Sequence, residues 1–120
     1  MIDTLRNDLL VRGLSDMLQL VSMASAAREH LPDSADEGDV IRATLNAIQD
    51  LLESGDAIAG DVGQDPDGLL RVRSWGLSPS DTVKRIENEW HAIGRLLALG
   101  EVVWLELTET GRAAARAVAS

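Results

Sequence analysis

Three side chains suited to acid–base chemistry, Glu87, His91 and Arg95, recur at four-residue spacing. On a helix this spacing places them on one face, where the carboxylate would orient the histidine. The same spacing is ordinary for solvated ion pairs, and we favour that interpretation. His30 is the only other histidine, and the chain lacks cysteine. Disulfides, thiolate metal sites and thiol catalysis are therefore excluded.

The segment Asp65-Pro66-Asp67-Gly68 resembles part of a calcium-binding loop. However, the first and twelfth positions of such a loop would be Gly63 and Ser74, so the ligands at both ends are missing. The sequence also lacks a Gly-x-Ser-x-Gly nucleophile motif, a phosphate-cradling glycine loop and a His-Glu-x-x-His motif. We therefore predict that the protein is not an enzyme and that it has no metal and no cofactor.

Acidic residues are concentrated between Glu29 and Asp67. This segment contains eleven acidic residues and one basic residue, Arg42, so its net charge is −10, whereas the whole chain carries −9. One interpretation is solvated helix ends and turns, where acids are favoured. The other is a docking surface for a basic partner, because opposed fields speed encounter. The predicted partner-binding residues are Asp36, Glu37, Asp39, Asp50, Glu53, Asp56, Asp61, Asp65 and Asp67.

Nucleic-acid binding is disfavoured by the same distribution of charge. A recognition helix over Val40–Leu52 would bring acidic residues towards phosphates, with only Arg42 to offset them. The basic residues form one cluster, which comprises Arg71, Arg73, Lys84 and Arg85. Because Asp81, Glu87 and Glu89 are near this cluster in the sequence, we expect salt bridges there rather than a track for phosphates.

Hydrophobic periodicity predicts helix over Asp3–Leu31, divided or bent at Gly13. The part from Leu14 to Ala27 is apolar nearly all round, which is typical of either a central helix or a dimer interface. We expect Met17 and Met23 to fill the core.

The middle of the chain contains local signals for a helix and a hairpin. Ser34–Glu37 fits a capping box in front of an amphipathic helix over Val40–Leu52, which Gly55 ends. We expect Asp50, Glu53 and Asp56 to be exposed where this helix finishes. The segments Ala57–Val62 and Leu69–Trp75 flank a turn-rich stretch, so they predict a hairpin.

The last third begins with a serine cap and a proline, which predict a helix from Ser78 to about Leu97 with Trp90 buried. A strand over Glu101–Leu107 follows, and its apolar run predicts burial on both faces, with Trp104 as an anchor. Thr108 then caps an alanine-rich helix that extends to Val118. Gly111 inside this helix predicts close backbone packing.

The residues Leu107-Thr108-Glu109-Thr110-Gly111-Arg112 carry a family resemblance. They resemble the end of bacterial winged-helix domains, where the last wing strand runs into Leu-Thr-x-x-Gly-Arg and a helix. The resemblance covers residues 36–118, although a helix over Ser78–Leu97 interrupts the wing. The stretches Trp75–Pro79, Arg85–Trp90 and Gly100–Trp104 are also similar to small uncharacterised proteins of GC-rich bacteria.

These observations predict an α+β fold in one domain, residues 1–120, with a helical segment over 1–31 and a winged-helix-like core over 36–118. The domain would be mostly helical, with a three-stranded antiparallel sheet and a helix inserted in the wing. The predicted function is an inhibitor or immunity-type protein that neutralises a basic partner such as a nuclease toxin. The alternative is a winged-helix transcriptional regulator or a structural module that forms a homodimer through Leu14–Ala27. Since the first thirty residues do not resemble a signal peptide and no run is long enough to span a membrane, we expect a cytoplasmic protein.

Overall fold

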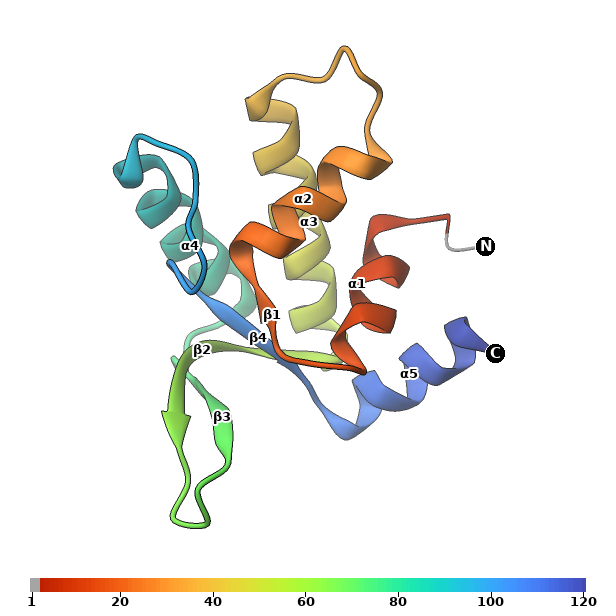
Figure 1. Ribbon diagram of the computed structural model, residues 1–120, viewed down its shortest axis with the longest axis vertical. Helices are drawn as coiled ribbons and strands as arrows, with labels where there is room; N and C mark the ends of the chain where they lie inside the picture. Colours follow the sequence, from red (N-terminus) through yellow and green to blue (C-terminus); the bar gives the residue numbers. More distant parts are fainter. Residues whose placement is uncertain (1–2) are drawn as a thin grey trace.

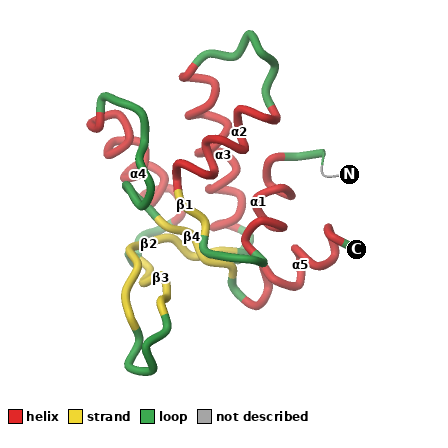
Figure 2. Tube along the Cα trace, viewed as in Figure 1, coloured by secondary structure: helices red, strands yellow, loops and turns green. Residues whose placement is uncertain are grey.

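Five helices pack beside an antiparallel sheet in the computed structural model, which describes residues 3–120 (Figure 1). The α+β class is confirmed, but the described sheet has four strands, in the order β1-β4-β2-β3, where three were predicted. The helices gather around one part of the sheet, while the β2–β3 hairpin projects away from them (Figure 2). The elements are α1 (Leu5–Gly13), β1 (Leu18–Gln19), α2 (Leu20–His30), α3 (Glu37–Glu53), β2 (Ala57–Gln64), β3 (Leu70–Ser74), α4 (Pro79–Ile93), β4 (Trp104–Leu107) and α5 (Glu109–Ala119).

The additional strand lies between the two N-terminal helices. The predicted break at Gly13 is confirmed, because α1 ends there. The chain then forms β1, in which Leu18 and Gln19 pair with Leu105 and Trp104 of β4. Two residues are too few to show a strand periodicity in the sequence, which is why the prediction missed β1.

The apolar character of the second helix reflects its central position. Five residues of α2 are buried: Leu20, Met23, Ala24, Ala26 and Ala27. The prediction that Met23 fills the core is confirmed, whereas Met17 is only partly buried and Leu14 is 37% exposed. Packing within one chain accounts for most of the Leu14–Ala27 segment, and a homodimer through it stays a prediction.

Helix α3 is amphipathic as predicted, but its cap is different. Asp36, not Ser34, is the N-cap, because its carboxylate accepts the Asp39 backbone N–H at 2.8 Å and the Asp39 carboxylate accepts that of Asp36 at 3.1 Å. The capping box is thus formed two residues later than predicted. Leu45 and Ile48 are buried, and Gly55 with φ of +78° follows the helix end as expected.

The predicted hairpin is present as β2 and β3. Strand β2 pairs with two other strands: its first half pairs with β4 and its second half with β3. Gly60 lies at the change of partner, where a Cβ atom would collide with the backbone carbonyl of Arg73. After β3, the Trp75 backbone N–H donates to Ala59 at 3.1 Å, and the Arg85 guanidinium of α4 lies 3.7 Å from the Trp75 ring centroid.

Helix α4 begins as predicted and ends earlier. Ser78 accepts the Asp81 backbone N–H at 3.1 Å and Pro79 occupies the first turn. The helix stops at Ile93 because Gly94 adopts a left-handed conformation, with φ of +66°. The predicted extension to Leu97 is wrong, although Trp90 is buried as expected, with 6% exposure.

Strand β4 is shorter than predicted and is buried on one face only. It starts at Trp104 because Val102 has φ of +74° and the Val103 N–H donates to the Glu101 carbonyl at 3.0 Å, a strained γ-turn that interrupts extended backbone. Leu105 and Leu107 are buried, but Trp104 is only partly buried. The predictions of two buried faces and of a fully buried Trp104 are therefore wrong.

Candidate protein-binding surface

The acidic residues at the start of α3 are engaged within the protein. Asp36 and Asp39 form the capping box, and Asp39 also lies 3.3 Å from Arg42. The Glu37 carboxylate lies 3.0 Å from Arg28 at the end of α2. These three predicted partner-binding residues therefore stabilise the α2–α3 connection, and their charges are largely balanced nearby.

Asp56 is buried, so the prediction that it is exposed is wrong. Its side chain is 6% exposed and lies 2.7 Å from Arg6 of α1, while the Ser54 hydroxyl donates to it at 2.7 Å. The backbone carbonyl of Asp56 accepts the Thr108 N–H at 3.0 Å. A Cβ atom at Gly111 would collide with that carbonyl, which confirms the predicted close packing of Gly111. Asp56 is thus a structural residue at a junction of α1, β2 and α5.

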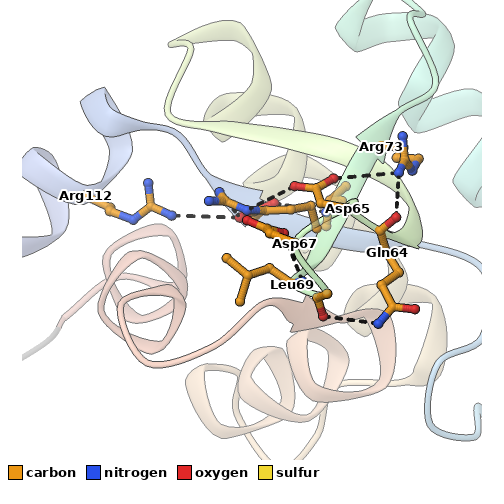
Figure 3. Close-up of polar contacts among 10 residues, drawn as sticks. Gln64, Asp65, Asp67, Leu69, Arg73 and Arg112 are labelled. Atoms are coloured by element: carbon orange, nitrogen blue, oxygen red, sulfur yellow. Dashed lines mark hydrogen bonds and ion pairs between the residues drawn. The ribbon is translucent and has the colours of Figure 1, made fainter.

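Asp65 belongs to an ion-pair cluster at the hairpin (Figure 3). It lies 3.6 Å from Arg73 and 3.9 Å from Arg71. Arg71 also lies 3.3 Å from Glu106 of β4, which is 3.8 Å from Arg112 of α5. The prediction that Arg71 and Arg73 form salt bridges is confirmed, but their partners are Asp65 and, for Arg71, Glu106 rather than the expected acids that follow in the sequence. Arg85, as predicted, pairs with Glu89 at 2.7 Å.

The remaining predicted residues, Asp50, Glu53, Asp61 and Asp67, are exposed. None of the four forms an ion pair with a residue in the range 3–120. Asp67 accepts the Leu69 N–H at the hairpin tip, and Glu53 accepts a hydrogen bond from Gln49 at 2.7 Å. Asp50 and Glu53 occupy the last turns of α3, where the helix dipole disfavours negative charge.

A groove of about 300 Å³ lies between α3 and α4. Its apolar side chains are those of Ile41, Leu45 and Val83, its polar side chains are those of Arg42, Asn46, Glu87 and His91, and Gly38 completes the lining. The amphipathic patterns of the two predicted helices gave no sign of a groove between them. Ile41 and Val83 are only partly buried. Their exposure depends on how the two helices cross, which the sequence pattern of each helix does not show.

The predicted Glu87–His91–Arg95 row is only partly formed. His91 lies 3.8 Å from Glu87, beyond hydrogen-bond distance, and both side chains are exposed, which agrees with a solvated pair. Arg95 lies beyond the helix and makes two contacts with Glu101, at 2.7 and 2.8 Å. The Arg95 contacts, together with the Ala98 backbone N–H at 2.6 Å, lower the pKa of Glu101 from 4.5 to about 2.

The loop that Glu101 organises exposes two leucines. Leu96 is 81% exposed and Leu99 is 78% exposed. The loop is also tied to β1, because the Gly100 N–H donates to the Gln19 side chain at 2.6 Å. The loop was not predicted because the apolar periodicity of α4 continues past Gly94.

The second histidine, His30, lies 2.9 Å from Asp8. Burial acts to raise the pKa of Asp8, but hydrogen bonds from Arg12 and His30 outweigh it and lower that pKa below its usual value. Across residues 3–120, no three metal-ligating side chains come together in a group that could hold a metal ion.

Comparison of the chain with protein-family models, curated proteins and solved structures finds no match. Within the described range, none of the helices has both the length and the apolar character needed to cross a bilayer. The arrangement of side chains is therefore the basis for a functional proposal.

Proposed function

We propose that this protein is a non-enzymatic binding protein of inhibitor or immunity type, which covers a basic site on a protein partner such as a nuclease toxin. The observation that carries the proposal is the pair Asp50 and Glu53. Both are exposed, neither is paired with a cation of residues 3–120, and both lie at the end of α3 that disfavours negative charge. Acids retained at an electrostatic penalty are typical of a surface used for binding.

A winged-helix-like scaffold is part of this proposal. The element order supports it, because the short strand β1 separates the first two of the three N-terminal helices, and β4 pairs with both β1 and β2. In this interpretation β3 and α4 are inserted in the wing. A regulator that binds DNA through α3 is the second candidate, and Asp50 and Glu53 would oppose phosphates in that role.

The proposal is tested by co-purification from a bacterium that carries the gene, followed by mass spectrometry. The Asp50→Asn/Glu53→Gln variant is compared with Asp33→Asn/Glu109→Gln, which removes the same charge from two other exposed positions. We expect a basic partner to be retained by the wild type and the control and to be lost or reduced with the first variant. Purified partner should associate more slowly with that variant and with a weaker dependence on salt.

Equal binding of both variants with unchanged salt dependence contradicts the proposal. Gel-shift titration with mixed-sequence duplex DNA provides the complementary experiment. Saturable binding that weakens steeply with added salt would favour the regulator instead.

A further inference from the structure

The groove and the exposed acids share one stripe of α3. Gly38, Arg42 and Asn46 line the groove at four-residue intervals, and Asp50 continues the same interval. Residues spaced in this way lie on one helical face, and Glu53 falls on it as well. The acidic end of α3 is therefore an extension of the groove wall.

The apolar part of the groove has room for a side chain. A cavity of about 150 Å³ in a protein core holds a benzene molecule, and the α3–α4 groove has about 300 Å³ lined by Ile41, Leu45 and Val83. Arg42 on the rim is held at 3.3 Å by Asp39, and His91 lies 3.8 Å from Glu87. The carboxylates of Asp39 and Glu87 therefore offset the positive charge on this rim, so the rim does not repel a basic ligand.

We infer that the α3–α4 groove binds an amphipathic helical segment of the basic partner. Apolar side chains of that segment lie in the groove, and its lysines or arginines lie over Asp50 and Glu53. The helical form follows from the site, because a third helix packs naturally between two helices and presents apolar residues at i, i+4 and i+7. A second copy of this chain would bring another acidic surface to Asp50 and Glu53. The inference rests on the proposed function and specifies its partner.

The test uses a synthetic peptide of about 18 residues, long enough as a helix to cover the roughly 25 Å of α3. It carries leucines on one face and lysines towards one end, and a scrambled peptide of the same composition is the control. Binding is followed at about 150 mM salt by fluorescence anisotropy of the labelled peptide and by amide chemical shifts of the protein. We expect shifts at Ile41, Asn46 and Val83, and weaker binding of the scrambled peptide.

One variant tests the site without removing a buried side chain. Asn46→Trp fills the groove from its exposed rim. We expect it to weaken binding by about tenfold, while Leu96→Ser and Leu99→Ser, at exposed positions outside the groove lining, leave affinity unchanged. Loss of binding in all three variants, equal binding of the scrambled peptide, shifts elsewhere, or no binding at all overturns the inference. If Asn46→Trp retains a natural partner that Asp50→Asn/Glu53→Gln loses, the proposed function stands and the groove inference fails.

Discussion

Asp56 and the pair Asp50 and Glu53 are only a few residues apart, yet their surroundings are opposite. Asp56 is buried against Arg6 and Ser54, whereas Asp50 and Glu53 are exposed on the last turns of α3. The difference arises because the chain turns at Gly55 and brings Asp56 against Arg6 of α1 and Gly111 of α5. A local excess of acid therefore combines charges that stabilise the fold with charges that remain free to meet a partner. Four experiments test this comparison.

The largest effect is expected when the junction around Asp56 is forced open. Gly111→Ala places a Cβ atom against the Asp56 carbonyl, and since both contacting groups belong to backbone, relief requires movement of α5. We expect the free energy of unfolding to fall by about 3 kcal/mol or more, measured by urea denaturation. Ala113→Gly, at an exposed position of the same helix, is the control and should cost about 1 kcal/mol. A Gly111→Ala variant as stable as this control would show that the junction is loosely packed.

Replacement of the Asp56 side chain tests whether this acid stabilises the fold. Asp56→Asn removes the charge that Arg6 and Ser54 contact, in a nearly isosteric way. We expect a loss of about 1–3 kcal/mol in the free energy of unfolding. Asp50→Asn is the matched control and should change stability by less than about 0.5 kcal/mol. Equal effects of the two substitutions would remove the distinction between structural and free acids.

Glu101 extends the comparison to an acid that is paired at the surface. Its pKa is lowered from 4.5 to about 2, so its contribution to loop stability is complete above pH 4.5 and is lost as the pH falls from 4.5 towards 2. The protection factors of the Ala98 and Gly100 amides, which are exchange rates corrected for the intrinsic effect of pH, should fall across this window. In Glu101→Gln the two amides should be poorly protected at every pH, and an unchanged profile in that variant would contradict the assignment.

The smallest effect on stability is expected at the exposed acids. Asp50→Asn/Glu53→Gln should leave the free energy of unfolding unchanged or slightly raised, within about 0.5 kcal/mol, because the helix end disfavours negative charge. Thermal and urea denaturation at low and high salt provide the measurement. A clear destabilisation would mean that the two carboxylates have structural partners, which weakens the argument for a binding surface.

Elements with local signals were predicted from the sequence. The Ser78-Pro79 start of α4, the Thr108 cap of α5, the hairpin and the Gly55 stop depend on residues within a turn of each other. The errors involve either distant pairing or competing local signals. Strand β1 exists through its pairing with β4, and the apolar periodicity beyond Ile93 concealed the stop at Gly94.

The candidate surface was less predictable than the fold. Exposure of Asp50 and Glu53 follows from the helix period, because they lie opposite the buried stripe. Burial of Asp56 depends on Arg6 and on the return of the chain at Thr108, and neither contact has a signal near Asp56 in the sequence. The groove depends on the distance between α3 and α4 along the stretch that Ile41 and Val83 line. The hydrophobic period of either helix alone does not determine this distance.

The stacking of Arg85 on Trp75 makes the tryptophan fluorescence of the protein sensitive to the position of α4. The chain has three tryptophans and neither tyrosine nor phenylalanine, so its near-ultraviolet fluorescence comes from indole alone. Trp90 emits from the core, whereas Trp75 lies with a guanidinium 3.7 Å from its ring centroid, at the point where the hairpin meets α4. Any rearrangement of α4 against the hairpin that displaces this cation alters the emission of Trp75. The unlabelled protein thus contains a spectroscopic reporter beside the helix that forms one wall of the groove.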